Sequence, residues 1–185
     1  MSNKIYALIG PHGAGKSRLA SMLIERQIHF IPHYTTHVFV KGDPCEKLSR
    51  RVDRWDFPKE DLIVRTTRQG DYYGVQKADV LEALEAHERS VMLLDPAGIS
   101  QLERVIKGSL ATIFLMVDYV TVVSRLLKMG YTGDDLRYQL QYAETNREFD
   151  NWKLTDYVVK NTREPEDALR QIMAIMGMNI PIFQS

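Results

Sequence analysis

The stretch GPHGAGKS, from Gly10 to Ser17, decides the fold class of this chain. It matches the pattern G-x-x-x-x-G-K-[ST], with Gly10, Gly15, Lys16 and Ser17 at the fixed positions. The residues before it, KIYALI (4–9), form a short apolar run typical of a buried parallel strand, and the residues after it repeat apolar side chains at helical spacing. A strand, a glycine-rich loop and a helix in this order predict a loop that binds the phosphates of a nucleoside triphosphate.

Each residue type in this loop has a physical reason to be there. Glycines let the backbone turn tightly and present its N–H groups to phosphate oxygens. We expect the Lys16 ammonium to bridge the β- and γ-phosphates of ATP and the Ser17 hydroxyl to bind Mg²⁺. A chance match in a turn is the alternative, and the flanking strand and helix count against it. The predicted ATP-binding loop residues are Gly10, Gly13, Ala14, Gly15, Lys16, Ser17 and Arg18.

A second candidate for the magnesium site follows another apolar run. VMLLD (91–95) ends in Asp95, and the carboxyl ends of parallel strands form the sheet edge where ligands bind. We therefore predict that Asp95 holds Mg²⁺ through water. The alternative is that Asp95 caps the turn that continues with Pro96 and Gly98.

The rest of the chain alternates between strand and helix patterns. Apolar runs at 111–117 and 156–160 predict strands, and helical periodicity predicts helices at 78–88, 99–106, 134–149 and from 165 to Gly177. This alternation predicts an α/β fold of the P-loop NTPase type, in which three layers enclose a parallel sheet.

One segment departs from that pattern. Residues 32–76 are polar and rich in arginine, with short β-like pieces at 34–40 and 61–67. We interpret the chain as a single domain with a core at 1–31 and 77–185 and a small inserted lobe at about 32–76.

Composition limits the possible partners. The 185 residues are 44% hydrophobic and 26% charged, with 24 basic and 24 acidic side chains, so no overall charge favours nucleic acid or an acidic membrane. Cys45 is the single cysteine, which excludes an internal disulfide and suits a reducing compartment. No apolar run approaches the roughly 18 residues of a membrane span. We expect a cytoplasmic protein with no nucleic-acid or membrane partner.

The order of motifs resembles the guanylate kinase family of nucleoside-monophosphate kinases from Lys4 to about Met176. Besides the loop, the matching pieces are HYTTH (33–37), DYYGV (71–75), VMLLDPAG (91–98), SRLLKMG (124–130), YQLQYAETNREF (138–149) and TDYVVKN (155–161). The resemblance implies a core that binds ATP and Mg²⁺, a small β lobe that binds an acceptor monophosphate, and a lid at about 125–140.

The resemblance also implies roles for single residues. Thr35, Thr36, His37 and Tyr73 lie where the family binds the acceptor, although β propensity could explain the threonines and packing could explain the tyrosine. The lid residues Arg125 and Arg137 would stabilise the transferring phosphoryl group together with Lys16.

Two of these assignments have open alternatives. Arg137 is off the family register by about half a turn and could instead pair with Asp134 or Asp135. Asn161 would lie near the adenine, or serve as a turn residue before Thr162.

The departures from the family pattern concern the acceptor. His37 and Val40 replace two phosphate-binding arginines, Val64 falls near the guanine-reading glutamate, and Met129 and Gln139 replace two lid arginines. Together these losses argue against GMP as acceptor. Seven cations could rebuild an anion site or form a solvated face balanced by acidic neighbours: Lys41, Lys47, Arg50, Arg51, Arg54, Arg65 and Arg68.

These observations predict an ATP-dependent nucleoside- or deoxynucleoside-monophosphate kinase with altered acceptor specificity. Two alternatives stay open, because a fold does not determine a function. One is a kinase for another small molecule, and the other is a nucleotide-binding module with weak or no kinase activity. The intact phosphate loop counts against the latter.

Overall fold

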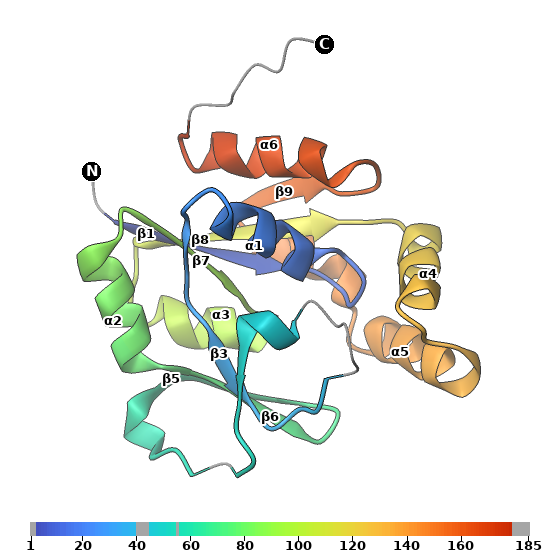
Figure 1. Cartoon of the computed structure of the whole chain (residues 1–185), viewed down its shortest axis with the longest axis horizontal. Coiled ribbons are helices and arrows are strands. Elements are labelled where there is room, and N and C mark those ends of the chain that lie inside the picture. The colour runs from blue at the N-terminus through green and yellow to red at the C-terminus, as the bar shows by residue number, and fades with distance from the viewer. Residues whose placement is uncertain (1–2, 40–44, 55, 179–185) are drawn as a thin grey trace.

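A parallel sheet forms the centre of the molecule in the computed structural model, which describes residues 3–39, 45–54 and 56–178 (Figure 1). Its four strand pairings are all parallel. The strand before the glycine-rich loop, β1, lies in the middle. The order across the sheet is β2 (His29–Phe30), β7 (Arg89–Leu93), β1 (Lys4–Ile9), β8 (Leu110–Met116) and β9 (Tyr157–Lys160).

Helices cover both faces of the sheet, as the apolar strand runs predict. Alternate residues of β1 belong to different apolar clusters: Tyr6 and Leu8 pack with α1 and α6, whereas Ile5 and Ile9 pack with α2 and α3. The three-layer α/β prediction is therefore confirmed. The covering helices are α1 (Lys16–Ile24), α6 (Pro165–Ile175), α2 (Lys77–Ala86) and α3 (Pro96–Glu103).

A smaller sheet lies beside the central one, within residues 33–76 (Figure 1). Its order is β4 (Ser49–Arg51), β3 (His33–Thr35), β6 (Asp71–Gln76) and β5 (Leu62–Arg68), and two 3-10 helices, η1 (Glu46–Leu48) and η2 (Lys59–Asp61), connect its strands. Strands β5 and β6 form an antiparallel hairpin through Gln69 and Gly70, both with positive φ. The small sheet shares an apolar cluster with the core, because Val64 and Val75 pack in the same group as Ile5 and Met92.

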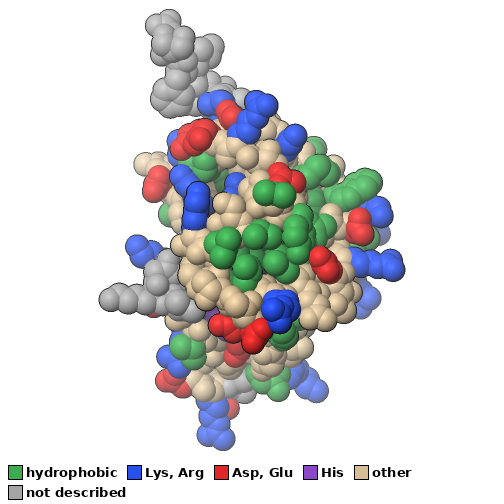
Figure 2. Space-filling model, turned by 90° about the vertical axis from the view of Figure 1, so that its right-hand side faces the viewer, with side chains coloured by type: hydrophobic (Ala, Val, Ile, Leu, Met, Phe, Trp, Pro, Cys, Tyr) green, Lys and Arg blue, Asp and Glu red, His purple; other side chains and the backbone are tan. Residues whose placement is uncertain are grey.

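The remaining helices are α4 (Tyr119–Lys128) and α5 (Gly133–Thr145), on the right of Figure 1. The helix predicted for 134–149 is wrong beyond residue 145. Arg147 adopts a left-handed backbone with φ of 50°, which ends regular helix, and a 3-10 segment, η3 (Glu148–Leu154), follows. Figure 2 shows hydrophobic side chains gathered on this side of the molecule, where Val120 (76%), Leu127 (48%) and Tyr138 (52%) are exposed.

Among residues 3–39, 45–54 and 56–178, none of the helices combines the length and the apolar character needed to cross a bilayer.

Candidate active site

The glycine-rich loop joins β1 to the N-terminus of α1 at the carboxyl edge of the central sheet (Figure 1). Gly13 and Gly15 have φ of 83° and 91°, in the left-handed region that favours glycine. A Cβ on Gly15 would lie 2.6 Å from Nδ2 of Asn161, so this position also requires the absence of a side chain. The loop backbone is thus shaped for a close approach by a ligand at the positive end of a helix.

Lys16 begins α1, and its side chain folds back over the loop. Its Nζ donates hydrogen bonds to the carbonyl oxygens of Gly10 (2.7 Å) and Pro11 (3.0 Å). Burial of the ammonium group, together with the smaller effect of the positive charge of Arg68, lowers the pKa of Lys16 to about 8. A phosphate group would offer this buried cation a stronger partner than neutral carbonyls do.

Two side chains hold the loop from outside. Arg125 of α4 donates from Nη1 to the carbonyl oxygens of Gly13 and Ala14 (both 3.2 Å) and from Nη2 to that of Asn161 (2.9 Å). Asn161, 3% exposed, donates from Nδ2 to the carbonyl oxygen of Ala14 (2.7 Å), while its buried Oδ1 has no hydrogen-bond partner in the part of the chain that the structure describes. Asn161 is therefore more than a turn residue, because it ties the end of β9 to the loop.

Ser17 and Asp95 supply oxygen donors of the kind that Mg²⁺ prefers. Both side chains line the same cavity. Ser17 Oγ lies 2.7 Å from Sγ of Cys45, and Oδ1 of Asp95 accepts from the backbone N–H of Gly98 (2.7 Å). Asp95 thus caps α3, as the alternative assignment expected, and also faces the cavity. A hydroxyl and a carboxylate beside the loop fit a magnesium ion that is bound mainly through water and phosphate oxygens.

One cavity of about 450 Å³ joins the loop to the small sheet. On the loop side it is lined by Gly10, Gly13, Gly15, Lys16, Ser17, Arg18, Arg125 and Asn161, and on the small-sheet side by His37, Val64, Arg68 and Tyr73. Ala14, also predicted to bind the donor, is fully buried and does not line the cavity. Predicted donor and acceptor residues, distant in sequence, therefore share one chamber of the size of a ligand site.

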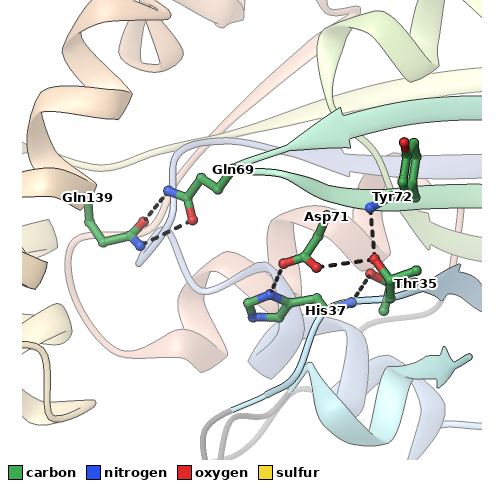
Figure 3. Close-up of polar contacts among 7 residues, drawn as sticks. Thr35, His37, Gln69, Asp71, Tyr72 and Gln139 are labelled. Atoms are coloured by element: carbon green, nitrogen blue, oxygen red, sulfur yellow. Dashed lines mark hydrogen bonds and ion pairs between the residues drawn. The ribbon is translucent and has the colours of Figure 1, made fainter. Parts of the chain in front are cut away.

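The predicted acceptor residues at the end of β3 and just beyond it form a hydrogen-bonded group (Figure 3). His37 Nδ1 lies 2.6 Å from Oδ2 of Asp71, and Thr36 Oγ1 donates to Oδ1 of the same carboxylate (3.1 Å). Thr35 Oγ1 accepts from the backbone N–H of His37 (3.0 Å), and Thr36 Oγ1 accepts from that of Tyr72 (3.0 Å). Neither threonine lines the cavity, so within this structure both order the strand end that carries His37.

Tyr73 lines the cavity from β6. Burial raises the pKa of its phenol to about 12, against the smaller opposing effect of a hydrogen bond with Thr35. Beside it, burial lowers the pKa of His33 to about 4. At neutral pH this part of the wall therefore presents a protonated hydroxyl and an uncharged imidazole, which can donate or accept without adding charge.

An apolar wall closes another part of the cavity. Val64, 3% exposed, lines it together with Val75, Leu93, Leu94 and Pro96. A Cβ on Gly98 would lie 3.2 Å from Cγ1 of Val64, so α3 packs directly behind this wall. Thr66, also on β5, adds a hydroxyl group to the lining.

The tip of the β5–β6 hairpin reaches α5 and η3. Arg68 pairs with Glu148 through Nη1 and Oε1 (3.0 Å) and through Nη2 and Oε2 (3.5 Å), and its guanidinium carbon lies 4.9 Å from the ring centre of Tyr142. The side-chain amides of Gln69, at the hairpin tip, and Gln139, on α5, exchange hydrogen bonds of 3.2 and 3.4 Å (Figure 3). Residues from the small sheet and from α5 and η3 are thereby joined over the cavity.

Arg137 lies apart from the other predicted site residues. Its side chain is 77% exposed, pairs with Asp134 at 3.0 Å, and is absent from the cavity lining. This is the arrangement weighed as its alternative. Met129 lines the cavity where the family pattern has an arginine, whereas Val40 and Lys41 fall outside the described residues.

Several cavity residues were missing from the sequence predictions. His12 lies inside the quoted loop and lines the cavity. Its Nε2 is buried with no hydrogen-bond partner among the described residues, and burial beside Lys16 lowers the pKa of His12 to about 3. Arg68 stood among seven similar cations, and no pattern distinguished it. Glu148 and Cys45 had no sequence signal, because their partners lie far away in the chain.

A phosphate loop after the central strand of a parallel sheet, followed by a buried lysine and a serine, defines a nucleotide-binding protein of the P-loop kinase class. The sequence model described as Guanylate kinase matches residues 2–178. The chain therefore belongs to the guanylate kinase family, as its motifs predicted, and this family uses ATP with Mg²⁺ as phosphate donor and cofactor.

Individual relatives are distant but collinear. The chain is 26% identical over 164 residues to guanylate kinase of Bartonella quintana (strain Toulouse), covering 85% of this chain and 73% of that one. It is 25% identical over 186 residues to guanylate kinase of Trichodesmium erythraeum (strain IMS101), covering 95% and 96%. The crystal structure of guanylate kinase from Anaplasma phagocytophilum superimposes with a TM-score of 0.68 at 20% identity, covering 95% and 85%, which confirms the fold.

Proposed function

We propose that this chain is a nucleoside-monophosphate kinase that transfers the terminal phosphoryl group of ATP to the phosphate of a ribo- or deoxyribonucleotide. The observation that supports this proposal most directly is that Lys16 and the loop line the same cavity as Tyr73 and His37. Donor and acceptor phosphates could meet there without a covalent intermediate, and in-line transfer depends mainly on such positioning.

In this proposal the loop N–H groups from Gly10 to Ser17, with Arg18 and Asn161 beside them, bind the donor. Lys16 exchanges its two carbonyl partners for phosphate oxygens. Mg²⁺, when bound, neutralises charge on the β- and γ-phosphates, and Ser17 and Asp95 are the residues that would hold it. Arg125, already fixed against the loop carbonyls, stabilises the loop and the charge of the phosphates.

On the other side of the cavity, Tyr73 donates its hydroxyl to the acceptor phosphate, and His37 is oriented toward it by Asp71 and by the Thr35 and Thr36 hydroxyls. The small sheet acts as the acceptor lobe (32–76), and residues 125–140 act as a lid on the core. Arg137 would have to leave Asp134 when the lid moves to contribute to transfer.

We further propose that the acceptor is a monophosphate other than GMP. Guanine presents N–H donors at N1 and N2, and a buried donor without an acceptor costs about 1–3 kcal/mol. The wall at Val64, Val75 and Leu93 offers no acceptor atom in its side chains. A base that presents fewer donors to this wall fits better.

The test is ADP formation by purified protein with ATP, Mg²⁺ and each ribo- and deoxyribonucleoside monophosphate in turn. We expect turnover with at least one monophosphate and weak turnover with GMP. Turnover with GMP alone would support the kinase activity and refute the proposed change of acceptor specificity. A stable ATP complex without turnover on any monophosphate would refute the kinase.

A further inference from the structure

We propose that Arg68 is the residue that binds the phosphate of the acceptor, with Glu148 and Tyr142 positioning its guanidinium. This inference rests on the proposed function, because it names the acceptor contact of the same cavity. Of the six described members of the cationic set in residues 41–68, Arg68 is the one that lines the cavity.

Three of the other described members have partners elsewhere, and Lys47 and Arg65 are exposed and do not line the cavity. Arg50 donates to the Tyr34 hydroxyl (2.6 Å), and Arg51 and Arg54 pair with their acidic neighbours Asp53 and Asp56. Arg65 lies on the same strand as Arg68 with its side chain exposed and outside the cavity. The small sheet therefore presents a single guanidinium to the chamber among its described residues.

The contacts of Arg68 leave it capable of binding an anion. A guanidinium carries five N–H donors, and the pair with Glu148 engages two of them, one on each terminal nitrogen. The ring of Tyr142 covers one face, which fixes the plane of the group. The side chain of Arg68 is 27% exposed and that of Glu148 11%, so the pair is sheltered but reachable from the cavity. Three donors in a fixed fork remain for phosphate oxygens.

The surroundings place this phosphate opposite the donor. The charge of Arg68 is felt by Lys16 and His12 of the loop and by Tyr73 of the small sheet, because it contributes to the pKa shifts of all three groups. Arg68, which is carried by the small sheet, lines the same cavity as Lys16, His12 and Tyr73. A phosphate held by both Arg68 and Tyr73 would face the terminal phosphate held by Lys16.

Glu148 is a positioning residue in this arrangement. An unpaired, nearly buried carboxylate would repel an incoming phosphate, and the ion pair with Arg68 neutralises that charge. Since Glu148 lies on η3, the pair also ties the small sheet to the segment that follows α5.

The experiment measures the affinity for the acceptor, so it tests the role of Arg68 whether or not phosphate is transferred. Isothermal titration calorimetry is performed with each nucleoside 5′-monophosphate and, for the monophosphate that binds most tightly, with the corresponding unphosphorylated nucleoside. Replacing Arg68 alone would leave the Glu148 carboxylate nearly buried without its ion-pair partner. The main variant therefore combines Arg68→Gln with Glu148→Gln, which gives a neutral hydrogen-bonding pair. Arg68→Lys, which keeps the charge and loses the fork, is the second variant, and Arg65→Gln is the control.

We expect the double variant to remain folded and to bind the monophosphate at least about tenfold more weakly, with nucleoside and ATP affinities unchanged. Arg68→Lys should fall between it and the wild type, and Arg65→Gln should match the wild type. Unchanged monophosphate affinity in both Arg68 variants, an equal loss in Arg65→Gln, or no monophosphate binding by wild type would overturn the inference. Arg68-dependent binding without any phosphoryl transfer would instead refute the proposed function and support this inference.

Discussion

The two sides of the cavity are built on different principles. The donor side is built around one continuous stretch, Gly10–Ser17, whose backbone conformation depends on its own glycines and which Arg125 and Asn161 hold from outside. The acceptor side is assembled from β3, β5, β6, α5 and η3, and its polar groups are fixed by partners far away in the sequence, such as Glu148 for Arg68 and Asp71 for His37. A local site tolerates little change at each position, whereas an assembled site can exchange one residue for another from a neighbouring element.

The largest effect is expected on the donor side. Lys16→Ala should lower kcat by about 10³-fold or more for any acceptor, because the charge that neutralises the transferring phosphoryl group is lost. Its Nζ contacts are with two backbone carbonyls, so the fold should survive. ADP formation and a melting curve check this, with Lys77→Ala on the exposed start of α2 as control. Full activity of Lys16→Ala would mean that the loop does not act on phosphate.

The second prediction separates backbone conformation from close contact. Gly15→Ala should weaken ATP binding by about 100-fold, because its Cβ would meet Nδ2 of Asn161 and push the loop out of shape. Gly108→Ala is the control. Gly108 also has a positive φ, of 86°, but a Cβ built there would lie within 4 Å of no described atom beyond its chain neighbours. It should cost only the left-handed strain of about 1–2 kcal/mol, measured by chemical denaturation, and leave ATP affinity intact. Equal ATP affinity in the two variants would contradict the role assigned to Asn161.

The third prediction uses pH. Below its pKa of about 8, free Lys16 is charged and ready for phosphate; above it, binding must first take up a proton. ATP affinity should therefore be flat up to about pH 8 and then fall by up to about tenfold per pH unit until the higher pKa of the bound state is passed. Calorimetric titration with Mg-ATP between pH 7 and 9.5 measures this. The same step should be missing in Lys16→Ala, and a step that persists there would assign the titration to another group.

The smallest effect is expected on the acceptor side. His37→Arg should change the KM for the acceptor by roughly three- to tenfold, because a fixed guanidinium replaces a half-exposed imidazole that lines the cavity. The KM for ATP should not move. Val38→Arg adds the same charge one residue further on an exposed side chain outside the cavity and serves as control. Identical acceptor KM values in all three proteins would place the acceptor away from His37.

The contrast between the two sides also explains what the sequence could predict. The strand at 4–9, the loop and the helix after it follow from local patterns, because each local preference agrees with the final fold. The strand runs at 91–95, 111–117 and 156–160 lie within two residues of β7, β8 and β9 for the same reason. The left-handed turn at Arg147 carries no glycine or proline signal, so the helix predicted at 134–149 ran too far.

Contacts between distant residues were beyond local reasoning. Arg68 and Glu148 are 80 residues apart, and Ser17 and Cys45 are 28 apart across a segment with no periodic pattern. The family pattern identified His37, Tyr73, Arg125 and Asn161, all of which line the cavity. It also suggested Arg137, which lies on the surface beside Asp134. Pairing over such distances depends on the packing of whole elements, which no window of sequence contains.

Val64 connects the two requirements that a protein of this kind must meet. Its side chain forms part of the wall against which the acceptor base would lie, and it also belongs to the apolar cluster that includes Ile5, Met92 and Phe114 of the central sheet. A change at this position alters recognition and folding at the same time. A single polar replacement at Val64 therefore cannot give a new base preference, because compensating changes are needed in the strands and helix packed beneath it. Acceptor specificity and the packing of the core therefore evolve together.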